Sequence, residues 1–302
     1  MGIYNIANTF CVVLTCTFPP LSVTLLFVWS YWTMIFKVYL ILYNGSKFCI
    51  CITTFAFVLS LWTYYKVLYT GSGSPVDYPE LRGENVPLCM SDSITMKRDG
   101  RYRYCTKCRC WKPDRTHHCS ACDKCILKMD HHCPWFGICI GYKNYRFFVQ
   151  FLCWSLVYLL VVTSMTFNVL YGFFVDGKWD TELFSVHVLL VFCLGVVFTL
   201  CIGVFTGFTI YQMCRNRTTI ESYERQRYRH TARRHLNVFD LGVTRNVLSV
   251  MGTKWYNIVM PVGNVEGDNG GGVSFETNLA GEEFVNSRNL VARLSSELER
   301  SV

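Results

Sequence analysis

Four long apolar stretches constrain the fold of this chain more than any other feature. They lie at about residues 10–36, 48–68, 147–174 and 183–213. Each supplies the roughly 20 apolar residues that a helix needs to cross a bilayer. Pro19 and Pro20 interrupt the first stretch, which predicts a kink or a late helix start there. The sequence therefore predicts an α-helical integral membrane protein with four transmembrane helices.

The placement of Lys and Arg predicts how these helices are oriented. Nearly all of the 29 basic residues lie between the second and third stretches or after the fourth. The loops within the two helix pairs carry only Lys37, Lys47 and Lys178. Because cytosolic loops are enriched in Lys and Arg, we expect both termini and the central segment in the cytosol. Basic segments beside a membrane also attract anionic lipid.

These features divide the chain into four expected parts. They are a helical hairpin (1–72), a cysteine-rich domain (73–146), a second hairpin (147–214) and a C-terminal tail (215–302). No internal repeat is visible. The tail becomes Gly-rich from about Gly263 and then charged. This composition predicts a flexible segment with a short helix near residues 291–300.

The central segment is rich in potential metal ligands. Eight of the 17 cysteines and four of the seven histidines fall within residues 105–139. Disulfides are rare in the cytosol, whereas Cys and His mixed at short spacings indicate metal binding. The spacing C-x2-C occurs at Cys105/Cys108 and at Cys119/Cys122. Two zinc sites of the common Cys3His type would use six cysteines and two histidines. Two cysteines and two histidines would remain.

The heptapeptide MDHHCPW, residues 129–135, leaves more than one function open. A purely structural zinc module that binds a protein would explain the ligands. A cysteine beside a histidine and a carboxylate also suits nucleophilic catalysis. A zinc hydrolase would need an open metal position for water, and two complete sets of four ligands argue against it. The tether to membrane helices on both sides favours an enzyme over an isolated module.

Asp130-His131-His132-Cys133, placed between the second and third of four membrane stretches, resembles the DHHC family of protein S-acyltransferases. The resemblance covers about residues 10–260. It also includes KPDRTHHC (112–119), CILKMDHHCPW (125–135), TTIE (218–221) and FDLG with a later Asn (239–242 and 246). The chain departs from the family pattern at residues 137–138, usually two asparagines, and at residues 73–75, usually Asp-Pro-Gly.

The resemblance implies two interleaved structural zinc sites. One would use Cys105, Cys108, His118 and Cys125. The other would use Cys119, Cys122, His132 and Cys139. His132 is then a metal ligand and His131 stays free. Cys110 matches no ligand position and is expected to be a spare, exposed thiol.

The resemblance also implies a protein S-palmitoyltransferase. Cys133 would take an acyl group from palmitoyl-CoA and pass it to a cysteine of a membrane-associated protein. His131 would act as the base, and Asp130 would hold the imidazole tautomer. Membrane lipid, acyl-CoA and proteins with membrane-proximal cysteines are the expected partners, and nucleic acid is not. A non-catalytic, zinc-stabilised membrane adaptor is the alternative.

Aromatic residues at helical spacing follow the cysteine-rich segment and are expected to line a cavity for the acyl chain. They are Phe148, Phe151, Trp154 and Tyr158. Tyr158 lies deep enough to help set chain length, and Trp135 is expected to close the cavity mouth. CoA is anionic, so basic side chains of the cysteine-rich segment are candidates for its binding. These are Lys112, Arg115, Lys124 and Lys128.

Three phrases are most similar to a fungal vacuolar subgroup of the family. They are GSGSP (71–75), CPWFGICIG (133–141) and MGTKW (251–255). The likeness implies a vacuole membrane location and an armadillo-repeat vacuolar protein as substrate.

Overall fold

Four long helices dominate the computed structural model of the chain. The structure describes residues 2–40, 45–91, 93–97, 100–175, 177, 185–227, 237–263 and 270–278. The helices are α1 (Gly2–Thr33, continued by the π-helix η1, Met34–Tyr39), α3 (Lys47–Thr70), α4 (Tyr145–Phe174) and α5 (Val186–Cys214). Among the described residues, these four are long and apolar enough to span a membrane. The predicted four-helix membrane architecture is confirmed.

The first helix runs without a break through Pro19 and Pro20. The predicted late helix start is therefore wrong. The hydroxyl of Ser22 donates to the Pro19 carbonyl at 2.9 Å, and that of Thr24 donates to the Pro20 carbonyl at 2.7 Å. Such bonds from a hydroxyl to a carbonyl three or four residues earlier give Ser and Thr side chains a partner within the helix itself.

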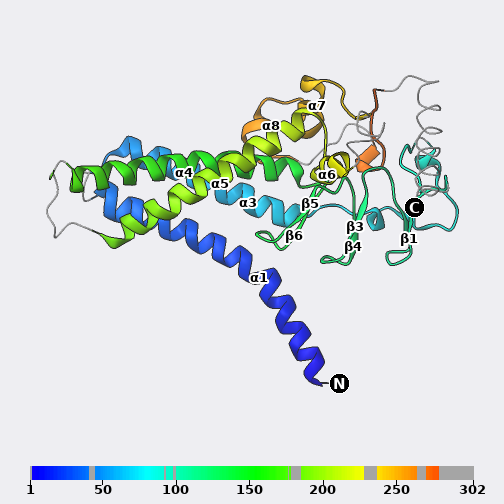
Figure 1. The fold of residues 1–302 in the computed structure, drawn as a ribbon, viewed down its shortest axis with the longest axis horizontal. Helices are drawn as coiled ribbons and strands as arrows, with labels where there is room; N and C mark the ends of the chain where they lie inside the picture. Colours follow the sequence, from blue (N-terminus) through cyan, green and yellow to red (C-terminus); the bar gives the residue numbers. More distant parts are fainter. Residues whose placement is uncertain are drawn as a thin grey trace.

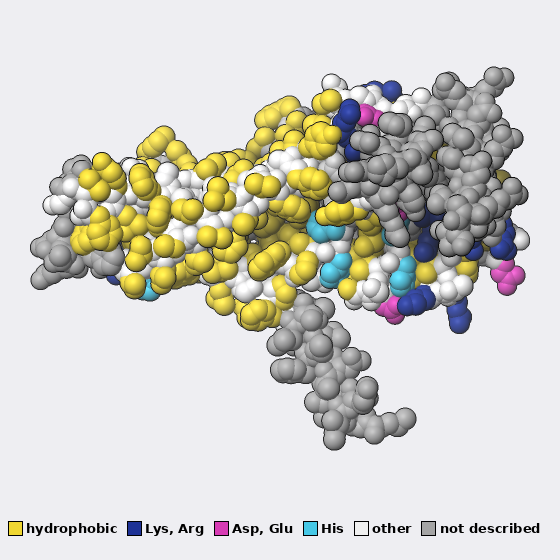
Figure 2. All heavy atoms as spheres, viewed as in Figure 1, with side chains coloured by type: hydrophobic (Ala, Val, Ile, Leu, Met, Phe, Trp, Pro, Cys, Tyr) yellow, Lys and Arg dark blue, Asp and Glu magenta, His cyan; other side chains and the backbone are white. Residues whose placement is uncertain are grey.

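The helices present apolar side chains to their surroundings (Figure 2). Leu200 and Val204 of α5 and Leu21 of α1 are all more than half exposed. Soluble proteins rarely expose so continuous an apolar surface, and a bilayer covers it without cost. Histidine and charged side chains gather instead at the opposite end of the molecule, over the cysteine-rich segment (Figure 2).

Three small antiparallel hairpins form the cysteine-rich segment between α3 and α4 (Figure 1). They are β1–β2 (Tyr104–Cys105, Cys110–Trp111), β3–β4 (His117–Cys119, Lys124–Ile126) and β5–β6 (His131–Cys133, Ile138–Ile140). Short 3-10 turns precede them at Pro75–Asp77, Pro79–Arg82 and Leu88–Met90. Such short strands cannot hold together through their own ladders, which points to another source of stability.

The hairpins repeat every 14 residues, which corrects the expectation that the chain has no internal repeat. Cys105, Cys119 and Cys133 each end the first strand of a hairpin. Four residues later, each turn has a residue with positive φ, at Arg109, Asp123 and Gly137. The repeat is hard to see in the sequence, because the third hairpin has Phe136 at the position that Cys108 and Cys122 occupy in the first two.

The C-terminal part covers the hairpins and the ends of the helices that adjoin them. It contains α6 (Thr219–Arg227), α7 (Val243–Met251), α8 (Tyr256–Val259) and η7 (Gly270–Gly272). Residues 271–278 lie against the cysteine-rich segment, so the expectation of a flexible chain from Gly263 onward is wrong for this stretch. The short helix expected near residues 291–300 lies outside the described residues.

Two apolar clusters fill the helix bundle. One lies at the end that carries the hairpins and includes Cys133, Phe148 and Phe151. The other lies further along the bundle and is centred on Tyr39 and Tyr158. The nucleophile candidate is therefore part of the same packed core as the helices below it.

Candidate active site and zinc centres

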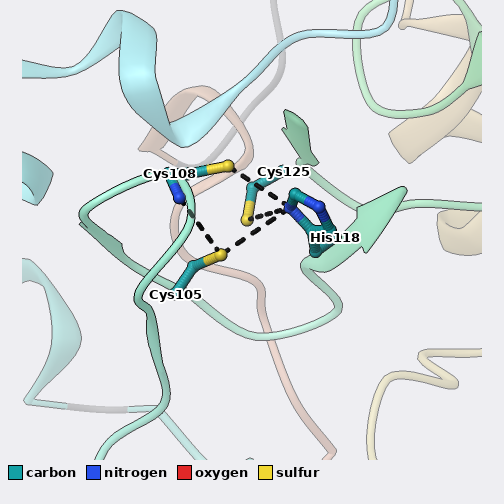
Figure 3. A group of neighbouring side chains, drawn as sticks. All are labelled: Cys105, Cys108, His118 and Cys125. Carbon is teal, nitrogen blue, oxygen red and sulfur yellow. Dashed lines mark hydrogen bonds between the residues drawn. The ribbon is translucent and has the colours of Figure 1, made fainter. Parts of the chain in front are cut away.

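The first Cys/His group gathers at the turn of β1–β2 and the stem of β3–β4 (Figure 3). The Nδ1 atom of His118 lies 3.7 Å from the sulfur of Cys105, 3.3 Å from that of Cys108 and 3.9 Å from that of Cys125. Zinc bonds of about 2.3 Å to sulfur and about 2.0 Å to nitrogen in a tetrahedron put ligand atoms roughly 3.5–3.8 Å apart. The four side chains therefore fit a zinc ion.

The second group repeats this geometry one hairpin later. The Nδ1 atom of His132 lies 3.7 Å, 3.3 Å and 3.6 Å from the sulfurs of Cys119, Cys122 and Cys139. The sulfurs of Cys122 and Cys139 lie 3.6 Å apart. Among the described residues, these two groups are the ones whose ligand atoms converge in this way. They contain the eight residues that the family resemblance implies.

The interleaving of the two groups follows from the hairpins. Each group takes two cysteines from the turn of one hairpin. It takes a histidine and a cysteine from directly opposite positions in the next, such as His118 and Cys125, or His132 and Cys139. Each ion would thus join two hairpins that are too short to be stable alone. Because metal binding contributes folding free energy, the segment is expected to fold as one unit.

Strand β5 explains why the chain has two adjacent histidines. Successive side chains of a strand point to opposite faces. His132 reaches the second Cys/His group on one face, which leaves His131 and Cys133 together on the other. The metal site on one side of the strand therefore fixes the pair on the other side.

Asp130 orients His131 directly. Its Oδ2 atom lies 2.7 Å from Nδ1 of His131, which leaves Nε2 of the ring for Cys133. Burial alone would lower the pKa of His131, but its hydrogen bonds with Asp130 and Cys133 outweigh burial and raise the pKa to about 9. The arrangement therefore favours the protonated imidazolium of His131 at neutral pH.

The start of α6 holds Asp130 from behind. The backbone N–H of Thr219 donates to Oδ1 of Asp130 at 2.9 Å, and its hydroxyl donates to Oδ2 at 2.8 Å. The favourable field at a helix N-terminus adds to these bonds. Asp130 is 3% exposed, so these donors and His131 take the place of water around its oxygens. The family resemblance identified the TTIE motif (218–221) in the sequence, but it did not predict that Thr219 binds Asp130.

A buried ion pair fixes α6 in turn. Arg115 donates to both carboxylate oxygens of Glu221, at 2.8 Å and 2.9 Å, and to the side chain and backbone oxygens of Asn216. Burial favours the neutral form of Glu221, but the charge of Arg115 outweighs it and holds the pKa of the carboxyl below its usual range. Two-point pairing of this kind fixes orientation as well as distance.

This ion pair changes the expectation for CoA binding. Arg115 is buried and occupied by Glu221 and Asn216, so it is not available to a ligand that approaches from solvent. Lys128 donates to Asn216 at 3.2 Å, and burial together with the neighbouring Arg115 lowers its pKa to about 7. Of the four candidates, Lys124 is exposed, and Lys112 and Lys128 are partly exposed. These three remain candidates.

Cys133 lies at the top of an aromatic cluster. It is buried among side chains from α3, α4 and its own turn, including Phe136, Phe148 and Phe151. Phe148 also packs edge-on against His131 with ring centroids 5.3 Å apart. Tyr158 lies deeper, where its hydroxyl is 2.9 Å from that of Ser30 on α1. Phe148, Phe151 and Tyr158 thus lie along α4, from the nucleophile candidate into the interior of the helix bundle.

Two other aromatic candidates lie elsewhere. The indole of Trp154 donates to the Val259 carbonyl of α8 at 2.9 Å, so this side chain belongs to the packing of α8 on α4. Helical spacing alone missed this because it placed all four rings on one face. Trp135 is 58% exposed, and its backbone carbonyl accepts a hydrogen bond from the Tyr64 hydroxyl.

Cys110 is buried, which corrects the expectation of an exposed thiol. It lies directly opposite Cys105 in the first hairpin and packs against Cys105 and Cys125. A small apolar side chain is well suited to such a position. The sequence could not reveal this, because a two-residue strand has too little alternation to show its buried face.

A multi-pass helical protein with two Cys3His groups and an Asp–His–Cys arrangement beside its helices has the features of a membrane-embedded thiol acyltransferase. The sequence model of the DHHC palmitoyltransferase family matches residues 98–226, and the chain belongs to this family.

Named relatives span most of the chain. It is 39% identical to palmitoyltransferase PFA3 of Saccharomyces cerevisiae over 272 residues, which cover 82% of this chain and 80% of that protein. It is 33% identical to palmitoyltransferase PFA3 of Candida glabrata, covering 98% and 99% of the two chains. It is also 31% identical to palmitoyltransferase ZDHHC2 of Rattus norvegicus, covering 88% and 76%. Family and relatives agree on a protein-cysteine S-palmitoyltransferase.

Proposed function

We propose that Cys133 carries the acyl group as a covalent intermediate between acyl-CoA and the protein substrate. The observation that supports this most directly is the chain of contacts from Thr219 through Asp130 to His131, on the strand face that also carries Cys133. A zinc adaptor would have no use for a buried carboxylate aimed at a histidine that binds no metal. Palmitoyl-CoA is the proposed donor.

The first step is a thioester exchange. The Cys133 thiolate attacks the carbonyl carbon of the acyl-CoA thioester, and the CoA sulfur leaves. His131, protonated beside the thiolate, donates its proton to the departing CoA thiolate. Asp130 stabilises the imidazolium and keeps Nδ1 engaged, so that Nε2 faces the reacting sulfur. No electron is gained or lost, and one thioester replaces another.

The second step reverses the roles. The neutral His131 takes the proton from the thiol of the substrate cysteine, and that sulfur attacks the acyl-Cys133 carbonyl. The Cys133 thiolate leaves and regains its imidazolium neighbour. Because Cys133 lies at the ends of the membrane helices, the substrate cysteine must itself lie close to the membrane.

The helix bundle offers the acyl chain an apolar environment next to Cys133. Each buried CH2 group contributes about 0.8 kcal/mol, so a chain seated among apolar side chains holds the donor at the site. Phe148 and Phe151 lie next to Cys133, and Tyr158 lies further along the same helix. We propose that these residues line the path of the chain and that Tyr158 limits its length.

Zinc has a structural role in this proposal. Both Cys/His groups have four protein ligands, which leaves no position for substrate or water. When bound, the ions would hold the three hairpins in register. His132 would thereby place β5, and with it His131 and Cys133, over the aromatic cluster.

The covalent intermediate can be tested with purified protein in detergent and labelled palmitoyl-CoA. We expect wild type to acquire label that neutral hydroxylamine removes, and Cys133→Ser to acquire none while retaining both zinc ions. Cys110→Ser, which removes a buried thiol outside both Cys/His groups, is the matched control. Equal labelling of wild type and Cys133→Ser, or no label on either, would favour the zinc adaptor.

Location and substrate rest on subgroup likeness and charge. We propose a vacuole membrane protein with both termini and the hairpins in the cytosol, acting on an armadillo-repeat vacuolar protein. The position of the basic residues supports this orientation. Fluorescent tagging would test the location. Acyl exchange on the candidate substrate, in cells with wild type or Cys133→Ser, would test the substrate, and unchanged acylation would reject it.

A further inference from the structure

A short C-terminal segment, residues 271–278, lies against the cysteine-rich segment, which is more than a hundred residues earlier in the sequence (Figure 1, orange to red). We call it the strap. The Tyr78 hydroxyl donates to the Gly271 carbonyl at 2.7 Å, and Val273 packs into a small apolar cluster with Leu81 and Met90. At the other end, the Asn278 backbone N–H donates to the Val238 carbonyl at 2.8 Å. Both ends of the strap are therefore attached.

The strap fits closely where it enters. Gly272 has a φ of +86°, and a Cβ there would lie 2.6 Å from the Tyr142 ring. Gly271 has a φ of +62°, and a Cβ there would lie 2.8 Å from the Tyr78 hydroxyl. Only glycine adopts such a backbone without strain while allowing this approach. The two glycines deliver the following residues to one defined place.

Phe275 is the residue that they deliver. Its ring centroid lies 5.3 Å from the guanidinium carbon of Arg115 and 5.8 Å from the Lys128 ammonium. Phe239 approaches the same guanidinium at 4.5 Å, and the two phenyl rings meet edge to face. An aromatic face attracts a cation, more strongly when both are removed from water. The strap thus supplies one of two rings against a buried charge.

Three contacts connect that charge to His131, the proposed partner of the nucleophile. Arg115 grips Glu221 of α6 at two points, and Thr219 of the same helix holds Asp130 at two points. Asp130 in turn orients His131. Without the Phe275 ring, the guanidinium would keep its hydrogen bonds but lose one of the two rings packed against it. A small displacement of Arg115 would shift the first turn of α6, and the Asp130 carboxylate would shift with it.

We infer that Phe275 is a positioning residue for acyl transfer: it fixes Arg115 against Glu221, and through α6 it sets the orientation of Asp130 and His131. This inference rests on the proposed roles of Asp130, His131 and Cys133. It gives the C-terminal segment a part in the chemistry although it touches neither substrate nor nucleophile.

The test compares four full-length variants with wild type in detergent. The initial rate of hydroxylamine-labile labelling is measured against palmitoyl-CoA concentration, together with zinc content. Phe275→Leu keeps an apolar side chain but removes the ring, and Phe275→Tyr keeps the ring. Ser274→Ala changes an exposed neighbour on the strap, and Cys133→Ser reports labelling elsewhere.

We expect Phe275→Leu to lower the saturating rate about fivefold or more, with an unchanged half-saturating concentration and both zinc ions retained. Phe275→Tyr should restore the wild-type rate, and Ser274→Ala should match it. A wild-type rate for Phe275→Leu, or no rescue by Phe275→Tyr, would overturn the inference. Loss of zinc in Phe275→Leu would make the strap a folding element and overturn it as well. Absence of label on wild type would refute the proposed function itself.

Discussion

Replacing Thr219 by Val tests one of the hydrogen bonds that hold Asp130 in place. Valine has nearly the same shape as threonine, so the start of α6 keeps its packing and its backbone bond to Oδ1 of Asp130. What disappears is the 2.8 Å hydrogen bond from the hydroxyl to Oδ2, the oxygen that also binds His131. Hydrogen bonds to a charged group contribute about 1.5–3 kcal/mol. With one of two bonds retained, we take the lower value.

A loss of about 1.5 kcal/mol in the orientation of Asp130 corresponds to roughly a tenfold lower rate of acyl-enzyme formation at saturating palmitoyl-CoA. Single-turnover labelling with hydroxylamine release measures that rate. Thr219→Ser, which restores the hydroxyl, is the control and should act like wild type. Zinc content should be equal in all three proteins, and Thr219→Ser should melt at the wild-type temperature. If Thr219→Val labels as fast as wild type, the contact does not orient the catalytic pair.

Three other perturbations test separate parts of the site. Cys122→Ser removes a ligand from the second Cys/His group. Because metal binding stabilises the fold, the purified variant should hold about one zinc ion less and unfold at a lower temperature. Full zinc content by atomic absorption would contradict this. The depressed pKa of Glu221 means that its ionised form stabilises the fold above the unfolded-state pKa of about 4.3 and that this stability is lost as pH falls through the folded-state pKa. The difference in melting temperature between wild type and Glu221→Gln should therefore be constant above about pH 5 and shrink below about pH 4, and a difference independent of pH would rule out the charged pair. Tyr158→Ala should raise labelling by stearoyl-CoA relative to palmitoyl-CoA because it opens space among α1, α3 and α4, whereas Tyr158→Phe should not; an unchanged ratio would remove Tyr158 from the chain-length limit.

Regular patterns in the sequence were sufficient for the membrane helices. The four apolar stretches correspond to α1 with η1, α3, α4 and α5, with ends shifted by at most three residues except at the start of α1, which begins eight residues earlier. The paired C-x2-C spacings were sufficient to indicate metal binding, and the resemblance assigned eight ligands to two sets that the structure brings together. In each case the signal lies in local periodicity or in motifs that family members share.

Contacts between distant segments could not be predicted in the same way. Arg115 was a candidate for CoA binding, because an isolated arginine in a basic segment carries no sign of its partner about a hundred residues later. Phe275 lies in a stretch that was predicted to be flexible because it is rich in glycine. Composition gives no sign of the distant cations, Arg115 and Lys128, against which the ring packs. Trp154 shared helical spacing with Phe151 and Tyr158, but the position of α8 decided which way it packs.

The 14-residue repeat has a consequence for the origin of the nucleophile. Each hairpin offers its turn cysteines to an ion that the following hairpin completes with a histidine and a cysteine. Three hairpins in a row can therefore complete only two ions, and the last turn always lacks a successor. Cys133 stands in that last turn, at the position that Cys105 and Cys119 occupy in the first two. The proposed nucleophile thus occupies a position equivalent to that of a metal ligand, in the one hairpin of the three that has no following hairpin to complete a metal site.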